Sequence, residues 1–272
     1  MTLGQLIRLA LAEDIGSGDI TSELLIPSDN TVTAHIVARS SGILAGIKVC
    51  AQVFKTVDRR TKFEPFYRDG SRFRRGAVLA RVFGPARAIL AGERTALNFL
   101  SHLSGIATFT DKFVTRVKGS KAVILDTRKT LPGWRALEKY AVRCGGGKNH
   151  RQGLYDMVLI KDNHIKIVGG VKEALARCYK CQKPVEIEVK TLEELRAALT
   201  AGARRVMLDN MTLPQLKKAV KIVAGRAKLE VSGGVNLKNV KAIARIGVDY
   251  ISIGAITHSA PAADISLEVV ES

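Results

Sequence analysis

The segment KAVILDTRKTLPGWRALEKYAVRCGGGKNHRQGLYDMVLIKDNH, residues 121–164, decides the fold. It opens and closes with short apolar runs, 122–125 and 157–160, and each run is followed at once by charged residues. Runs of this length with polar flanks predict buried strands. Between them we expect a helix over 134–143 and a glycine-rich loop over 144–151. Two strands that end in cations beside such a loop indicate a site for a multiply charged anion.

The same alternation continues toward the C-terminus. Successive apolar runs are roughly 20 to 35 residues apart, the size of a βα unit, and their apolar faces indicate a parallel sheet covered by helices. Six runs are too few for an eight-stranded barrel, and there is no nucleotide-binding fingerprint of a doubly wound sheet. We therefore predict an α/β fold with an incomplete, seven-stranded α/β barrel. The further runs are 185–189, 205–208, 229–231 and 250–253, and helical spacing covers 170–179, 192–201, 213–224 and 237–246.

The first 110 residues lack this regular alternation of strands and helices. Strand-like alternation appears at 31–39 and 78–82, and helical spacing at 50–57 and 86–103, whereas 13–26 is rich in turn residues. This pattern is typical of an α+β domain with short antiparallel strands. We expect the chain to divide into this domain, residues 1–110, and a barrel domain, residues 111–261.

The composition is that of a globular protein with a strong basic excess, 43 cations against 25 carboxylates, or +18. The excess fits a solvated basic surface, a nucleic-acid partner or a site for small anionic substrates. Basic residues are spread along the chain, and no nucleic-acid-binding motif is present, which disfavours the second explanation. The sequence has no apolar stretch long enough to span a bilayer, and its four cysteines lack zinc-like spacing, so we expect a cytoplasmic protein with free thiols.

Polar residues and glycines follow the predicted barrel strands, where barrel enzymes place their active sites. Cations come first along the chain, carboxylates follow, and glycines come last. The residues are Thr127, Arg128 and Lys129, then Lys161 and Asp162, then Glu188 and Lys190, then Asp209 and Asn210, then Ser232, Gly233 and Gly234, and finally Ile253, Gly254 and Ala255 with His258 after them.

Each group points to a part of one ligand site. The two glycine loops can bind phosphate through backbone amides, or can simply be tight turns. Glu188 and Asp209, at neighbouring strand ends, can hold Mg²⁺ together with substrate phosphates, or can pair with lysines of the site.

The cations are the most telling group. Arg128, Lys129, Arg151 and Lys161 would repel one another unless an anion lay among them, and His150 can donate to the same anion. Arg94, from the first domain, could reach this site or the site of a second subunit.

Four motifs resemble those of quinolinate phosphoribosyltransferases. They are ERTALN at 93–98, DTRKTLPG at 126–133, GGGKNHR at 145–151 and LIKDNH at 159–164. Shorter matches at 13–14, 18–21 and 254–259 extend the resemblance over essentially the whole chain, in order.

The resemblance implies a fold and an activity. The fold is an N-terminal α/β sandwich, joined by a C-terminal strand over 262–272, plus an incomplete seven-stranded barrel. The family converts quinolinate and phosphoribosyl pyrophosphate, with Mg²⁺, into nicotinate mononucleotide, CO₂ and pyrophosphate in NAD biosynthesis. It acts as a homodimer in which one subunit's N-terminal domain covers the other subunit's barrel.

The resemblance also implies roles for single residues. Lys129, Lys161, Glu188 and Asp209 are the expected catalytic residues, and Glu188 and Asp209 the expected Mg²⁺ ligands. Arg94 crosses the subunit interface, and Arg128, His150, Arg151 and Lys161 hold the quinolinate carboxylates. Lys129, Glu188 and Asp209 serve ribose and pyrophosphate, and Thr127 lines the substrate site. Ser232, Gly233, Gly234, Ile253, Gly254, Ala255 and His258 surround the 5′-phosphate.

Two alternatives remain from the sequence. One is a related phosphoribosyltransferase for a different aromatic acid, which needs fewer cations for carboxylates. The other is a basic nucleic-acid-binding protein, which needs no pyrophosphate chemistry.

Overall fold

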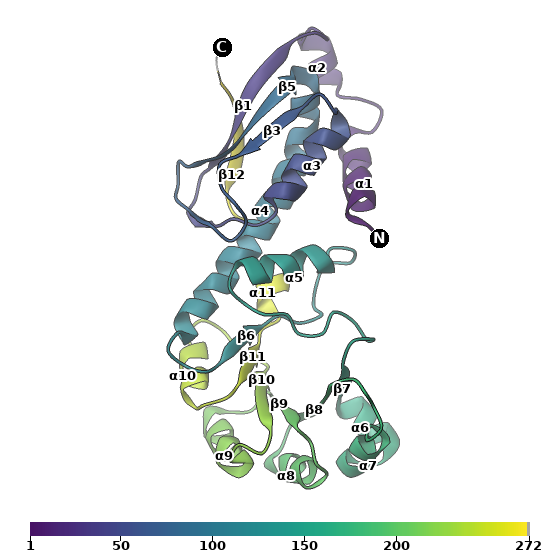
Figure 1. Ribbon diagram of the computed structural model, residues 1–272, viewed down its shortest axis with the longest axis vertical. Coiled ribbons are helices and arrows are strands. Elements are labelled where there is room, and N and C mark those ends of the chain that lie inside the picture. Colours follow the sequence, from purple (N-terminus) through teal and green to yellow (C-terminus); the bar gives the residue numbers. More distant parts are fainter. Residues whose placement is uncertain (271–272) are drawn as a thin grey trace. The chain divides into compact units, whose positions relative to one another are not determined.

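The structure, a computed structural model, describes residues 1–270 and divides into two compact units (Figure 1). The first unit consists of Met1–Asp111, Leu131–Gly146 and residues 259–270, and the second of Lys112–Thr130 and Gly147–His258. Residues 131–146, which the sequence-based division assigned to the barrel, therefore group with the first unit. The domain boundaries at 110 and 261 stay a prediction.

The first unit is built on an antiparallel sheet in the order β12-β1-β5-β3, which has four strands within residues 1–270. A two-stranded sheet of β2 and β4 accompanies it. The strands are β1 (Thr31–Ala38), β2 (Gly42–Ile43), β3 (Lys62–Pro65), β4 (Arg72–Phe73), β5 (Val78–Pro85) and β12 (Ile265–Val270). The helices of this part are α1 (Leu3–Ile15), α2 (Ile20–Leu25), α3 (Ile47–Val57), α4 (Ala86–Val117) and α5 (Arg135–Cys144).

The C-terminal strand returns to this sheet. β12 pairs antiparallel with β1, from Ala38 opposite Ile265 to Thr33 opposite Val270. The pairing thus begins three residues later than the expected start at 262, and residues 271–272 of that expectation lie outside the described residues.

Three expectations for this part were wrong in detail. Residues 20–25 are helical because Asp19 caps the turn, accepting a hydrogen bond from the Ser22 amide at 3.1 Å. β5 continues beyond 82 to Pro85, which pairs with Thr31 at the end of the ladder. α4 is 32 residues long and does not end near 103, because buried apolar residues continue at helical spacing.

Gly105 explains why α4 passes through a glycine. A Cβ atom at this position would lie 2.2 Å from the carbonyl oxygen of Pro261, so only glycine permits this close approach of two backbones. The residue that looks like a helix breaker in the sequence is thus a packing residue.

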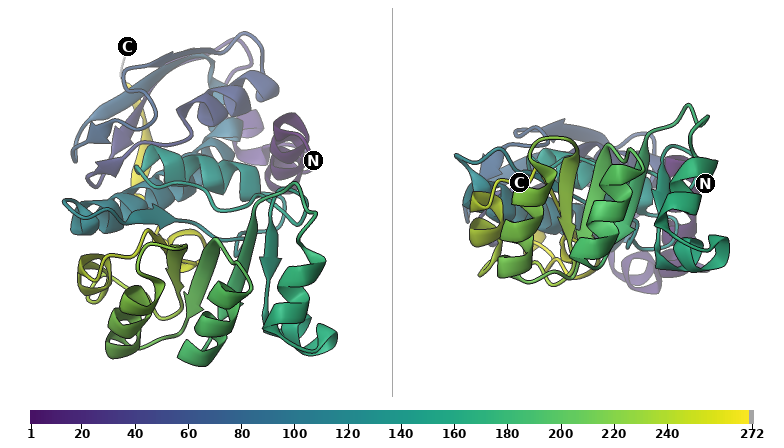
Figure 2. Two further views of the ribbon diagram at one scale, coloured as in Figure 1. Left: turned by 60° about the horizontal axis from the view of Figure 1, so that its bottom comes forward. Right: turned by 90° about the horizontal axis from the view of Figure 1, so that it is seen from below.

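The second unit is a parallel sheet in the order β6-β11-β10-β9-β8-β7, with six strands among the described residues. Helices lie on the outer side of this arc of strands (Figures 1 and 2). The strands are β6 (Val123–Leu125), β7 (Val158–Ile160), β8 (Val185–Val189), β9 (Arg205–Asp209), β10 (Lys228–Ser232) and β11 (Tyr250–Ser252). The helices are α6 (Asp162–Val168), α7 (Val171–Arg177), α8 (Leu192–Thr200), α9 (Leu213–Val223), α10 (Val240–Arg245) and α11 (Ala255–His258).

The predicted fold class, an α/β fold with an incomplete barrel, is confirmed, but residues 1–270 contain six parallel strands in place of the predicted seven. A single parallel bridge between Leu125 and Lys148 continues the sheet beyond β6, so the glycine loop occupies the next place in the arc. β6 and β7 are the two ends of the sheet order, and the barrel is therefore incomplete. Among residues 1–270, no helix is long and apolar enough to cross a membrane.

Asp249 ties the amino ends of the barrel strands together. Its Oδ2 accepts the Leu229 amide at 3.0 Å, and its Oδ1 lies 3.0 Å from Lys228 Nζ and 3.2 Å from Lys121 Nζ. Burial works toward a higher pKa for Asp249, but these hydrogen bonds outweigh it and hold the pKa below its usual value.

We predict that Asp249→Asn destabilises the protein by about 1 kcal/mol at pH 7. Most of this comes from the Leu229 amide, because both lysines are largely exposed. A lowered carboxyl pKa stabilises the fold above the ordinary pKa and loses that contribution as the pH falls. Urea unfolding from pH 7 downward should therefore show a constant gap between variant and wild type that closes below about pH 4. A gap that persists in acid would contradict the charge-based explanation.

Candidate active site

A cavity of about 710 Å³ opens at the carboxyl ends of the barrel strands in the second unit. Every barrel residue to which the family resemblance assigns a role lines it. The lining residues are Thr127, Arg128, Lys129, His150, Arg151, Leu159, Lys161, Glu188, Met207, Asp209, Asn210, Ser232, Gly233, Gly234, Val235, Ser252, Ile253, Gly254, Ala255 and His258.

Arg94 belongs to the other unit. It lies on α4, and its side chain is exposed. Asp162 and Lys190, which also follow strands, are not among the lining residues; they pair with each other at 2.7 Å. The cysteines at 50, 144, 178 and 181 are free thiols, as expected.

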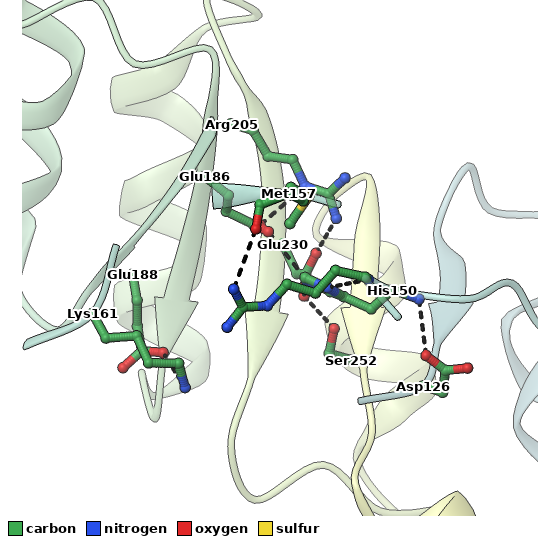
Figure 3. Close-up of polar contacts among 10 residues, drawn as sticks. Asp126, His150, Met157, Lys161, Glu186, Glu188, Arg205, Glu230 and Ser252 are labelled. Carbon is green, nitrogen blue, oxygen red and sulfur yellow. Dashed lines mark hydrogen bonds and ion pairs between the residues drawn. The ribbon is translucent and has the colours of Figure 1, made fainter. Parts of the chain in front are cut away.

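The two expected carboxylates end neighbouring strands. Glu188 is in β8 and Asp209 is the last residue of β9, and both line the cavity. Lys161 Nζ lies 3.4 Å from Glu188 Oε2 (Figure 3), and Asn210 Nδ2 donates to Asp209 Oδ2 at 3.0 Å. Glu188 therefore pairs with a lysine of the site, as one of the two expectations for these carboxylates had it, and the Mg²⁺ site stays a prediction.

Cations outnumber carboxylates around the cavity. Arg128, Lys129, Arg151 and Lys161 face two carboxylates, an excess of two positive charges before any histidine is counted. Burial lowers the pKa of Arg151, and the charge of Arg128 lowers it further, so these two guanidinium groups repel each other. A bound anion would relieve that repulsion.

The glycine turns bring bare backbone to the cavity. Gly233 and Gly234 have φ angles of +91° and +63°, in the left-handed region. A Cβ atom at Gly233 would lie 2.2 Å from Asn210 Oδ1. At Gly254 a Cβ atom would lie 3.0 Å from Lys129 Cδ and 3.1 Å from His258 Nε2. These turns can present amides to a phosphate without a side chain in between.

The loop after β6 is held in place by its neighbours. The Thr257 hydroxyl donates to the Lys129 carbonyl at 2.6 Å, and the Lys129 amide donates to the Thr127 hydroxyl at 3.0 Å. Asp126, fully buried, accepts the His150 amide at 2.9 Å and the Asn149 side chain at 2.5 Å. The loop that carries Arg128 is thus tied to the loop that carries Arg151.

A buried ionic cluster lies beside the cavity, and sequence reasoning missed most of it. We define it as His150, Glu186, Arg205 and Glu230. His150 Nε2 lies 3.1 Å from Glu186 Oε2 and 3.3 Å from Glu230 Oε1. Arg205 lies on the other side of the two carboxylates, with Nε 3.0 Å from Glu186 Oε1 and Nη2 2.5 Å from Glu230 Oε2 (Figure 3). The Ser252 hydroxyl also donates to Glu230.

The carboxylates and the loop amide act differently on His150. Burial disfavours a charged ring, but hydrogen bonds to Glu186 and Glu230 outweigh it and raise the pKa of His150 to about 9. Burial also disfavours a charged carboxyl group, and it raises the pKa of Glu186. At Glu230, contacts with His150 and Ser252 outweigh burial and lower the pKa to about 2. The Arg151 amide donates to His150 Nδ1 at 2.8 Å, so in this geometry Nδ1 carries no proton and the ring proton is on Nε2, facing the two carboxylates. The carboxylates favour a second ring proton, and the amide contact opposes it. Both ring nitrogens therefore have protein partners.

A sequence signal for this cluster existed. Glu186 and Glu188 occupy alternate positions of one apolar run, so both face the same side of β8, and Glu230 stands in the middle of another run. A carboxylate inside a buried strand requires a partner. The identity of that partner could not be read from the sequence, because Arg205 and His150 are distant along the chain.

Family models match most of the chain. The C-terminal domain model of quinolinate phosphoribosyl transferase matches residues 106–268, and the N-terminal domain model matches residues 19–104. The chain belongs to the quinolinate phosphoribosyltransferase family. The resemblance read from the sequence motifs is thereby confirmed.

Relatives of this phosphoribosyltransferase match along nearly its whole length. A carboxylating nicotinate-nucleotide pyrophosphorylase of Mycobacterium leprae is 46% identical over 271 residues, 97% of this chain and 95% of the relative. A probable enzyme of the same name from Bacillus subtilis is 42% identical over 275 residues, 99% of this chain and 94% of the relative. The structure of nicotinate-nucleotide pyrophosphorylase from Francisella tularensis superposes with a TM-score of 0.95 at 44% identity, covering 98% of this chain and 96% of that one.

We predict that Gly233→Ala destabilises this phosphoribosyltransferase more than Gly234→Ala. Both changes place a side chain at positive φ, which costs about 1–2 kcal/mol. Only at Gly233 does the new Cβ meet Asn210, since nothing lies within 4 Å at Gly234. Urea unfolding measures the loss of stability of each variant relative to the wild-type protein.

The background Asn210→Gly is the control for this comparison. It removes the side chain that Gly233→Ala would meet and itself tolerates the positive φ of 54° at that position. The two alanine changes should then cost the same. A difference that survives in this background would locate the clash elsewhere.

Proposed function

We propose that this protein transfers phosphoribose from phosphoribosyl pyrophosphate to the ring nitrogen of quinolinate, with loss of CO₂, to form nicotinate mononucleotide and pyrophosphate. This reaction supplies de novo NAD biosynthesis. One observation carries the proposal: in a chain of this family, four cations, two carboxylates and two glycine turns surround a single cavity at the barrel strand ends.

The part of the cavity that we assign to the substrate acid, called the acid side below, suits a dicarboxylate. Arg128, Arg151 and Lys161 supply three positive charges, and arginine forks match carboxylate geometry. Quinolinate carries two adjacent carboxylates, so it neutralises the repulsion between Arg128 and Arg151 better than a monocarboxylate does. This favours quinolinate over acids with one carboxylate.

The sugar side suits phosphoribosyl pyrophosphate. In this proposal Lys129, Glu188 and Asp209 bind the ribose hydroxyls and pyrophosphate. The backbone at Ser232–Gly234 and Ile253–Ala255, with Thr127 and His258 nearby, surrounds the 5′-phosphate. The positive φ angles of the first turn support this assignment, because such turns direct amides toward an anion.

The proposal includes Mg²⁺. Glu188 and Asp209 fit the ion, because they are oxygen ligands at adjacent strand ends and face the cavity that would hold pyrophosphate. When bound there, Mg²⁺ supplies charge that neutralises the leaving pyrophosphate.

The chemistry needs positioning more than a nucleophilic side chain. The quinolinate nitrogen forms a bond to the anomeric carbon as the bond to pyrophosphate breaks, and Lys129 stabilises the departing charge. The ring then carries a positive nitrogen. The adjacent carboxylate leaves as CO₂, its electron pair remains on the ring carbon, and a proton replaces it. Lys161 is placed to stabilise that carbanion or to donate the proton.

Pyrophosphate release tests the proposal directly. Purified protein with phosphoribosyl pyrophosphate and Mg²⁺ should release pyrophosphate when quinolinate is added, with CO₂ in equal amount. Release that requires nicotinate in place of quinolinate, and yields no CO₂, would assign the protein to another acid. Release with neither acid would overturn the proposal.

We predict that Arg151→Ala and Lys161→Ala each lower kcat/KM for quinolinate by about 30- to 1000-fold. The loss of one charge-assisted contact to a bound carboxylate costs roughly 2–4 kcal/mol. Lys190→Ala is the matched control, because this lysine also follows a barrel strand but pairs with Asp162 and does not line the cavity. Near-normal kcat/KM in either site variant would contradict the assignment of these cations to quinolinate binding.

The proposal also includes a cytoplasmic homodimer in which Arg94 acts on the partner's cavity. Free cysteines suit a reducing compartment. Arg94 is an exposed cation on a helix whose neighbouring residues belong to the family motif, which supports a role outside its own unit.

Mixing two inactive variants tests Arg94. Arg94→Ala and Lys161→Ala dimers should each have little activity, and refolding them together should restore about a quarter of wild-type activity. In a two-fold dimer half of the random pairs are mixed, and each mixed pair has one intact site. No recovery, with mixed dimers shown to form, would mean that Arg94 acts within its own chain or not at all.

A further inference from the structure

We propose that Glu186, Glu230 and Arg205 are positioning residues for the acid side of the cavity: they fix the His150 ring, and His150 fixes the backbone of Arg151. This inference rests on the proposed function for its kinetic readout. It assigns a role to three residues that do not line the cavity.

The geometry of the cluster suits this role. Glu186 on β8 and Glu230 on β10 lie on either side of β9, which carries Arg205, and both carboxylates are fully buried. Their oxygens converge on one ring nitrogen, at 3.1 and 3.3 Å. A ring held by acceptors from two strands has one orientation.

Arg205 makes the arrangement rigid. Its guanidinium pairs with both carboxylates and stacks over the Tyr250 ring, 4.4 Å from the centroid. Two buried carboxylates side by side would be costly without such a partner. Because apolar residues of similar volume would fill the same space at less cost, packing stability alone does not account for this set of buried charges.

His150 transmits this order to the cavity. Its Nδ1 accepts the Arg151 amide at 2.8 Å, while its own amide donates to Asp126 at 2.9 Å. The Arg151 guanidinium, in turn, donates to the Met157 carbonyl at 3.2 Å. If the His150 ring rotates, its contact with the Arg151 amide is lost, and the Arg151 backbone that carries the side chain shifts. The cluster thus determines where this cation stands.

A metal ion is the competing explanation for the cluster. Ligand atoms of His150, Glu186 and Glu230 lie within 4.8 Å of one another. Arg205, however, already pairs with both carboxylates and would repel a cation placed between them. The guanidinium, on the far side of the same two carboxylates, already supplies the positive charge that a metal would bring.

The inference predicts a substrate-specific kinetic effect. Glu230→Gln keeps an oxygen that can accept from His150 but removes the charge that pairs with Arg205. We expect the KM for quinolinate to rise roughly tenfold, with the KM for phosphoribosyl pyrophosphate within about twofold of wild type. Glu230→Ala, which removes the acceptor as well, should raise the quinolinate KM further, so that the glutamine variant is a partial rescue.

Asp249→Asn is the matched control. It removes a carboxylate charge at the opposite end of the same sheet and destabilises the barrel without touching the cluster. It should leave both KM values unchanged. If it raises the quinolinate KM as much as Glu230→Gln does, the cluster is only structural and the inference fails. Equal rises in both KM values for Glu230→Gln would overturn it as well.

A second readout does not depend on activity. The Arg151 amide should be protected from hydrogen exchange in the wild-type protein and should exchange at least tenfold faster in Glu230→Gln, but not in Asp249→Asn. If Glu230 variants do not fold, Ser252→Ala removes one hydrogen bond to Glu230 and should speed exchange of the Arg151 amide by a smaller factor. Exchange is the readout for this variant, because Ser252 also lines the cavity. An unprotected Arg151 amide in the wild type refutes the link even if the enzyme turns over quinolinate. Conversely, protection without quinolinate turnover would refute the function and leave the link standing.

Discussion

The register of the parallel sheet is the constraint on which this molecule depends. Alternate residues of each strand face the same side, and parallel strands place all their carboxyl ends at one edge. In β8 this puts Glu186 and Glu188 on the same side, one within the buried cluster and one at the cavity. In β10, Glu230 and Ser232 repeat the relation. A shift of one residue in either strand would remove both groups from the site at once.

The arrangement that makes the site selective for an anion also brings like charges close together, and these repel one another. The charge of Arg128 lowers the pKa of Arg151, and the cavity keeps an excess of positive charge in the absence of substrate. The fold holds these cations by tying their loops down: Asp126 accepts from the loop of His150, and Thr257 holds the Lys129 carbonyl. Binding of a dianion then releases electrostatic energy that the protein stored on folding, without a need to rearrange the backbone.

Much of the candidate site could be predicted because its residues come directly after apolar runs. Lys161, Glu188, Asp209 and Gly254 were found this way, since a parallel sheet turns a position in the sequence into a place at the cavity. Glu186, Glu230 and Arg205 were not found. They lie inside the strands. The alternation within a strand shows on which side of the sheet a side chain lies, but it does not show which other side chain contacts it. The single bridge at Lys148 escaped notice for a similar reason, because one paired residue leaves no apolar run.

The sequence by itself determined the alternation of strands and helices, the barrel class, the family and nearly all of the cavity wall, because these depend on periodicity and on contiguous motifs. Only the tertiary structure decided that α4 continues through Gly105 against Pro261, that the C-terminal strand pairs with β1 from Ile265, and that His150 turns both ring nitrogens toward protein partners. Each of these is a contact between segments far apart in the chain, and local pattern carries no information about which distant groups will satisfy a buried charge or accept a close backbone.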